Sequence, residues 1–158
     1  MTADEVGIPL QAFSALLHSD NITTVCRALN MYQVAASYTR LSGGNPLEPM
    51  GGEVREVALD ILSRPPVEEG PDIAAGFDHL SALNVLSSLA QPEDAELIAD
   101  VLETTDGQMW ATALLAAAAV PVPDERLVGV LERAAVDESR DEVERARAGA
   151  VRNKLLDS

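Results

Sequence analysis

Histidine, cysteine and serine are the residue types from which this chain could build a reactive site. Its two histidines are His18 and His79, and its single cysteine is Cys26. No Cys-x-x-Cys or His-x-x-x-His pair occurs, so the ligand spacing of a zinc site is missing. Ser81 follows His79 by two residues, and two such positions on a helix point apart, so His79 is not expected to activate it. We therefore expect no metal, no cofactor and no nucleophilic catalysis.

Two segments rich in glycine or proline are candidate contact loops. Residues 43–52, GGNPLEPMGG, lack the Lys-Ser or Lys-Thr pair of a nucleotide-binding loop. We interpret this segment as a flexible connection, with a partner-contacting loop as the alternative. Residues 64–71, RPPVEEGP, form a second connection, which the prolines should stiffen.

Carboxylates are the charged groups that this chain has in excess. It carries 26 acidic and 11 basic residues, a formal net charge of −15. Between Arg64 and Arg126 no lysine or arginine occurs, although the composition predicts about four. The flanking residues 1–50 and 127–158 are nearly balanced in charge. The acidic residues of the interval are Glu68, Glu69, Asp72, Asp78, Glu93, Asp94, Glu96, Asp100, Glu103, Asp106, Asp124 and Glu125.

Glu96, Asp100 and Glu103 follow one another at i, i+4 and i+7, so a helix places them on one ridge. Each like-charge neighbour pair costs about 0.2 to 0.5 kcal/mol, so local stability does not favour this ridge. An acidic surface attracts basic proteins and repels DNA and anionic membranes. A solvated, solubilising face and a weak calcium site are the alternatives. The predicted partner-binding residues are Glu68, Glu69, Glu93, Glu96, Asp100, Glu103 and Asp106.

The elements that must position these carboxylates are helices. Apolar residues recur at helical spacing in eight segments separated by Pro, Gly, Asn or Asp, and no run alternates as a strand would. The length fits one domain, so we predict a single all-α domain over residues 1–158. The predicted helices begin and end near residues 9–18, 22–41, 54–62, 77–89, 92–104, 108–120, 124–134 and 141–156.

For the first and sixth predicted helices, the apolar pattern predicts which residues belong to the core. The first should point Leu10, Phe13, Leu16 and Leu17 inward. The sixth is apolar nearly all round, with Met109, Trp110, Leu114 and Leu115, so we expect neighbours to cover it on several sides. Cys26 lies in an apolar helical pattern and is interpreted as a small buried residue. Trp110 and Tyr32 are interpreted as core residues.

A faint internal repeat relates the fifth and seventh predicted helices. A shift of 29 residues aligns Pro92 with Pro121, Glu96 with Glu125, Ile98 with Leu127, Val101 with Val130, Leu102 with Leu131 and Glu103 with Glu132. Helix pairs at this period resemble HEAT-like repeats over residues 10–38 and 93–156, and over 53–90 with an inserted loop. The resemblance implies a right-handed stack of about four antiparallel helix pairs, an α-solenoid that binds partners with one face.

No segment predicts a membrane span or a secretion signal. The longest apolar run, Leu114–Val122, has nine residues against the roughly 20 that a span needs. Residues 1–7 carry Asp4 and Glu5 without a basic or long apolar region, so we expect a soluble, cytoplasmic protein.

We expect a protein that is not an enzyme and binds a basic partner protein through its acidic helical face, such as a small inhibitor or immunity protein. It should be a monomer or a weak homo-oligomer, and should bind no nucleic acid and no membrane. One alternative is an adaptor or scaffold subunit that binds through a groove independently of charge. Another is an enzyme that uses paired carboxylates, which requires two acids to converge in a pocket. Asp78 or Asp100 buried with a raised pKa next to a cleft would support it.

Overall fold

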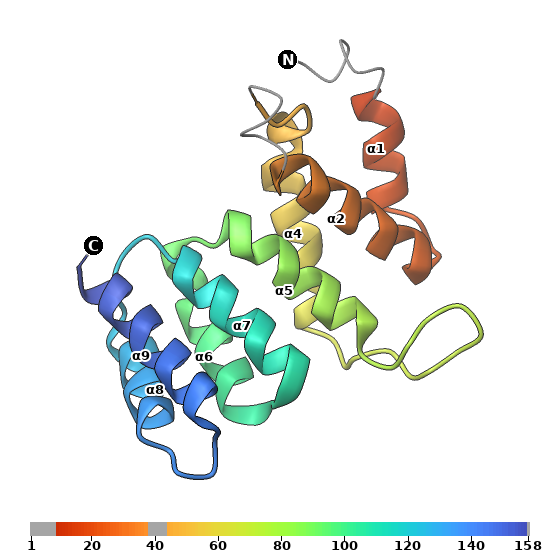
Figure 1. Cartoon of the computed structure of the whole chain (residues 1–158). Helices are drawn as coiled ribbons and strands as arrows, with labels where there is room; N and C mark the ends of the chain where they lie inside the picture. Colours follow the sequence, from red (N-terminus) through yellow and green to blue (C-terminus); the bar gives the residue numbers. More distant parts are fainter. Residues whose placement is uncertain (1–8, 38–43, 158) are drawn as a thin grey trace. The chain divides into compact units, whose positions relative to one another are not determined.

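The computed structural model describes residues 9–37 and 44–157, and these residues form eight α-helices and no β-strand (Figure 1). The prediction of an all-α protein is therefore confirmed. The end predicted for the second helix, residues 38–41, lies outside the described part. The α-helices are α1 (Leu10–Leu17), α2 (Ile22–Ser37), α4 (Gly51–Leu62), α5 (Phe77–Leu89), α6 (Ala95–Thr104), α7 (Gly107–Ala119), α8 (Glu125–Ala135) and α9 (Glu142–Leu156), with short 3₁₀ helices η1 (Glu48–Met50) and η2 (Pro92–Asp94).

The contacts within the chain define two compact units, residues 1–88 and residues 89–158. We call them the N-terminal and the C-terminal unit and describe each by itself. The single domain expected from the chain length stays a prediction.

In the N-terminal unit, α1, α2 and α4 pack against one another (Figure 1). Phe13 and Leu17 are four residues apart on α1, and both are buried. Leu16 is 38% exposed, so the prediction that it points inward is wrong. A helix of eight residues has one narrow buried face, and Phe13 and Leu17 occupy it.

The glycine-rich segment is more ordered than we predicted. Leu47 and Met50 are buried, and the side chain of Asn45 accepts a hydrogen bond from the Leu47 N–H at 2.9 Å. Gly51 and Gly52 already belong to α4. The interpretation of a plain flexible connection is therefore wrong for residues 45–52, because two apolar side chains anchor them.

The proline-rich connection before α5 is closed by hydrogen bonds at its base. The carboxylate of Asp78 accepts the Val67 N–H at 3.2 Å, and the His79 ring is hydrogen-bonded to the Arg64 carbonyl at 2.8 Å. The Gly76 N–H donates to the Val67 carbonyl at 2.9 Å. Asp78 is 4% exposed, so it serves as a buried structural acceptor at the start of α5.

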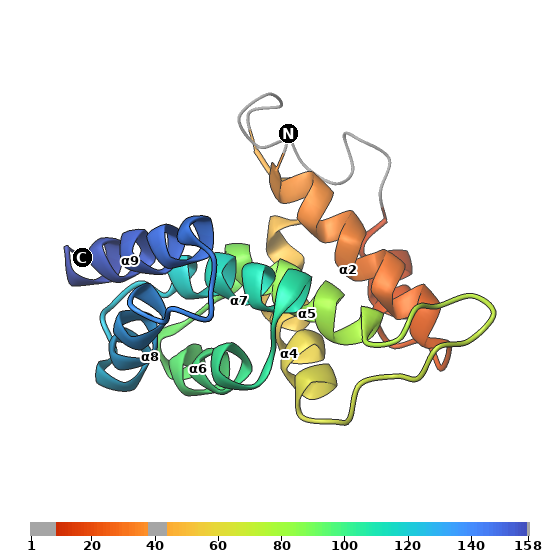
Figure 2. The same cartoon turned by 60° about the horizontal axis from the view of Figure 1, so that its bottom comes forward.

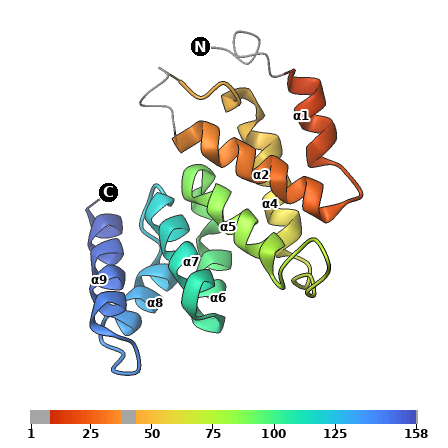
Figure 3. The ribbon, with the colours of Figure 1, turned by 45° about the vertical axis from the view of Figure 1, so that its right-hand side comes forward.

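The C-terminal unit consists of two layers of helices. The helices α6 and α8 form one layer, and α7 and α9 form the other (Figures 2 and 3). Within the unit, α6 packs against α7 and α8, and α9 packs against α8 and α7. This pattern is compatible with a helical repeat, because the 29-residue shift relates α6 to α8.

Capping side chains fix where the helices of the C-terminal unit begin. Asp124 accepts the Leu127 N–H at 3.0 Å at the start of α8. Asp141 and Glu144 form a reciprocal capping box at the start of α9, in which Asp141 accepts the Glu144 N–H at 2.7 Å. Such caps contribute about 1 kcal/mol each.

The core of the C-terminal unit includes Trp110, which is 2% exposed, but α7 is not covered on all sides. Leu114 is buried, whereas the adjacent Leu115 is 58% exposed. Neighbours therefore cover α7 on two sides, as predicted, but not at Leu115. The helices α6 and α9 cover two faces of α7, and the face that carries Leu115 is left exposed in this unit.

Candidate functional site

The three carboxylates predicted to form a ridge do lie together on α6. The side chains of Glu96, Asp100 and Glu103 are 81%, 63% and 42% exposed. We call these three residues the α6 acidic edge. Their shared side of the helix follows from their spacing of four and three residues.

Arg126 of α8 lies among these carboxylates. Its guanidinium donates hydrogen bonds to the carboxylate of Asp100 and, at 3.3 Å, to that of Glu103. It also donates to the Glu96 carbonyl at 3.2 Å and lies 3.7 Å from the Glu96 carboxylate. The hydrogen bond with Asp100 raises the pKa of Arg126 above its ordinary value. The α6 acidic edge is therefore bound within the protein by one arginine.

The position of Arg126 explains why an unfavourable run of like charges is tolerated. Arg126 is the first basic residue after the acidic interval, and it follows Asp100 by 26 residues. Arg133, also on α8, approaches Glu103 at 3.7 Å. Three carboxylates thus face two guanidinium groups, and the edge keeps an excess of one negative charge.

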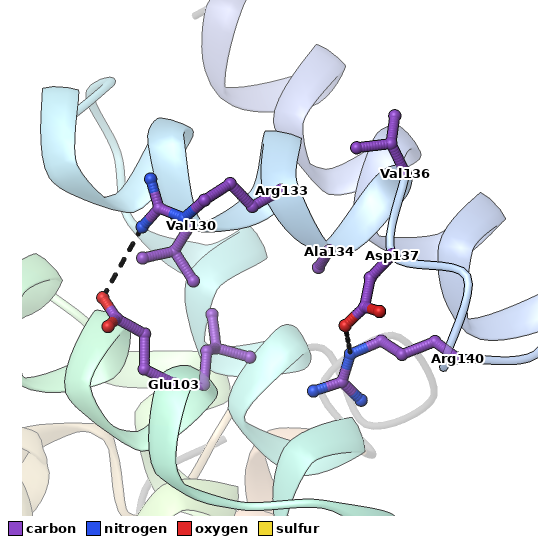
Figure 4. Close-up of a pocket in the computed structure, with 8 residues that line it drawn as sticks. Glu103, Val130, Arg133, Ala134, Val136, Asp137 and Arg140 are labelled. Atoms are coloured by element: carbon purple, nitrogen blue, oxygen red, sulfur yellow. Dashed lines mark ion pairs between the residues drawn. The ribbon is translucent and has the colours of Figure 1, made fainter.

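A cavity of about 450 Å³ adjoins the α6 acidic edge between α6 and α8 (Figure 4). Its charged groups form two ion pairs, Glu103 with Arg133 at 3.7 Å and Asp137 with Arg140 at 3.9 Å. Hydrogen bonds from Ser139 lower the pKa of Asp137, so this carboxylate stays ionised at neutral pH. The lining residues are Leu102, Glu103, Val130, Arg133, Ala134, Val136, Asp137 and Arg140.

Arg140 joins the turn before α9 to the turn before α7. Its guanidinium lies 4.0 Å from the centre of the Trp110 ring and 3.3 Å from the carboxylate of Asp106. The carboxylate of Glu144 on α9 lies 3.6 Å from the Arg140 guanidinium. Asp106, one of the predicted partner-binding residues, is 89% exposed and already has this intramolecular partner.

The other predicted partner-binding residues lie on elements other than α6. Glu93 is exposed in η2, at the start of the C-terminal unit. Glu68 and Glu69 are exposed in the connection before α5, which belongs to the N-terminal unit. We therefore treat the residues 68 and 69 as a separate acidic loop.

A hydrogen-bonded cluster in the N-terminal unit was not found by sequence reasoning. Glu53 of α4 accepts hydrogen bonds from the Ser14 hydroxyl and from the His18 ring, both at 2.7 Å. The hydrogen bond from Ser14, and to a smaller extent that from His18, lowers the pKa of Glu53. The serine is bonded to the carboxylate and not to the imidazole, so the cluster lacks the serine-to-base contact of a nucleophilic site. Ser14 lies on α1 and His18 follows the end of that helix, whereas Glu53 lies on α4, 35 residues after His18, so the sequence spacing relates only Ser14 and His18.

Three other groups considered for chemistry, Asp100, Asp78 and Cys26, are each paired or buried. Asp100 is exposed and paired with Arg126, while Asp78 is buried and holds backbone N–H groups. Burial raises the pKa of the Cys26 thiol, which is fully buried. In the described ranges, no three His, Cys, Asp or Glu residues converge as metal ligands would.

No helix in the described ranges has the length and apolar character that crossing a bilayer requires. The sequence matches no known protein family, no curated protein and no solved structure.

Proposed function

We propose that this protein is a non-catalytic interaction module that binds a basic partner protein through the α6 acidic edge, as a small inhibitor or immunity protein does. The observation that carries the proposal is the exposed set of three carboxylates around Arg126. This set retains a negative charge after its intramolecular pairing, within a unit that holds 15 acidic and seven basic residues.

Arg126 supports this role because it fixes the carboxylates before a partner arrives. A preorganised carboxylate loses less conformational entropy on binding than a mobile one. Glu96 is the most exposed of the three and is the farthest from Arg126, so its carboxylate is the natural first contact for a lysine or arginine of a partner. The negative field of the unit speeds the encounter and disfavours nucleic acid.

The contacts of Arg126 decide which carboxylate should be substituted in a test of this site. Reversing Asp100 would break a contact with Arg126, so a loss of binding could reflect damage to the α6–α8 packing. Glu96→Lys changes the most exposed carboxylate and leaves Asp100 and Glu103 in place. Glu132→Lys is the matched control, because Glu132 is exposed on α8 and its substitution changes the net charge by the same amount.

The test is affinity capture of basic proteins from native lysate, read by mass spectrometry. Glu96→Lys should lose a specific basic protein that wild type and Glu132→Lys both retain, with unchanged circular dichroism. Added salt should weaken the capture, because exposed charges are screened. Equal loss with both variants would indicate a non-specific charge effect, and retention with Glu96→Lys would refute the proposed site.

An adaptor or scaffold role is the second candidate, favoured by an apolar groove of about 530 Å³ between α7 and α9. Its binding should be less sensitive to salt than that of the α6 acidic edge. For either role we propose that the helices form HEAT-like pairs in a right-handed solenoid. The 29-residue repeat and the two-layer packing of the C-terminal unit support this architecture.

A further inference from the structure

The groove in the layer of α7 and α9 combines apolar walls with a basic side chain. On α7 it exposes Leu115, 58% accessible, one turn from Ala111 and Ala118. On α9 it is bordered by Arg147, which is exposed. The remaining lining residues are Thr112, Leu114, Ala150 and Val151.

Arg147 differs from the arginines near the α6 acidic edge. Arg126, Arg133 and Arg140 each face at least one carboxylate within 4 Å. Arg147 makes no ion pair with any residue in the described ranges. In a chain with 26 acidic residues, a groove whose charged group is an unneutralised arginine is complementary to an incoming carboxylate.

The shape of the groove favours a helical occupant. It lies between two helices, and alanines at 111, 118 and 150 leave room for a third helix to approach. A leucine side chain from that helix can pack against Leu115, as in other helix-in-groove complexes. A second copy of this chain is a poor fit, because a two-fold contact would pair this surface with itself and bring no carboxylate from the groove lining to Arg147.

We propose that this groove binds an amphipathic helix of a partner protein that carries a carboxylate beside its apolar stripe. The groove is distinct from the α6 acidic edge, which belongs to the layer of α6 and α8 and would attract a basic surface. The proposal therefore rests on the adaptor role, the second candidate function, and not on the function proposed for that edge.

Fluorescence anisotropy with two designed peptides tests the proposal. Each labelled peptide has about 16 residues, between four and five turns of helix, and a leucine stripe. Glutamates flank the stripe in one peptide, and lysines replace them in the other. The chain variants are Arg147→Glu, the charge-removing Arg147→Gln and Leu115→Glu. Arg152→Glu, on the same helix but outside the groove lining, is the matched control.

The glutamate peptide should bind wild type and Arg152→Glu with similar affinity, and Arg147→Glu about tenfold more weakly. Leu115→Glu should also bind it weakly. The lysine peptide should bind Arg147→Glu more tightly than wild type, a charge swap that a folding defect cannot produce. Glu96→Lys should leave the peptide affinities unchanged, which separates this site from the α6 acidic edge.

Three results would overturn the proposal. One is no saturable binding of the glutamate peptide, and another is an equal effect of Arg147→Glu and Arg152→Glu. The third is a wild-type dimer in sedimentation that Leu115→Glu dissociates, since a second copy would then occupy the groove. Arg147→Gln keeps the test decisive if the charge reversal unfolds the chain.

Discussion

The guanidinium of Arg140 lies over the ring of Trp110, 4.0 Å from its centre, and this contact joins the turn before α9 to the first turn of α7. The Arg140 side chain is 13% exposed, whereas that of Asp106 is 89% exposed, so solvent screens the ion pair between them from the carboxylate side. Arg140 also faces the carboxylate of Glu144. One side chain therefore combines a cation–π contact with ion pairs from two directions.

Replacing Arg140 with alanine should lower the free energy of unfolding by about 1 to 3 kcal/mol, because the cation–π contact and the ion pairs are lost together. Urea denaturation followed by circular dichroism measures this change. Arg152→Ala is the control, because the Arg152 guanidinium bonds only to the neighbouring Asn153 among the hydrogen bonds described. Equal destabilisation by both changes would contradict the central role of Arg140.

Arg126→Ala should lower the thermal midpoint by leaving Glu96, Asp100 and Glu103 without their shared partner. Added salt should reduce the difference from wild type, since it screens repulsion among exposed carboxylates. Calorimetry at low and high ionic strength measures the effect. A difference that does not change with salt would show that Arg126 acts through packing and not through charge.

The Glu53 cluster should make stability depend on acid pH. Glu53 has an ordinary pKa of 4.5, which the folded protein lowers, so its contribution is fully present above pH 4.5 and is lost as the pH falls through the folded value. Ser14→Ala removes the largest cause of this shift. Wild type should therefore be more stable than Ser14→Ala at pH 6, with the difference shrinking below pH 4.5. Urea titrations over this range measure it, and a constant difference would contradict the assignment.

Cys26 should report the opening of the N-terminal unit. Its thiol is fully buried and its pKa is raised, so both access and thiolate formation limit its reactivity. A thiol reagent should label the native protein far more slowly than the protein in denaturant. Rapid labelling under native conditions would show that α2 opens without global unfolding.

The helices could be predicted from the sequence because their determinants are local. Apolar spacing located α5 at its observed ends, Phe77 and Leu89. The helices predicted to begin near residues 92 and 141 begin with η2 at Pro92 and with Asp141, the N-cap of α9. The signals that predict a helix start act within about one helical turn.

The features that were mispredicted or missed depend on residues far apart in the chain. The pairing of Arg126 with Asp100 spans 26 residues, so counting charges along the sequence overstated the acidity of the ridge. Leu115 has the same apolar character as the buried Leu114, and only tertiary packing distinguishes them.

The order of charges along the chain also constrains how the protein is made. The ribosome completes α6 before it adds Arg126, Arg133 or Arg140, so the nascent carboxylates first emerge without the cations that later bind them. Until then each neighbouring pair of these carboxylates repels by about 0.2 to 0.5 kcal/mol, and the contacts between α6 and α8 can form only after α8 has left the exit tunnel.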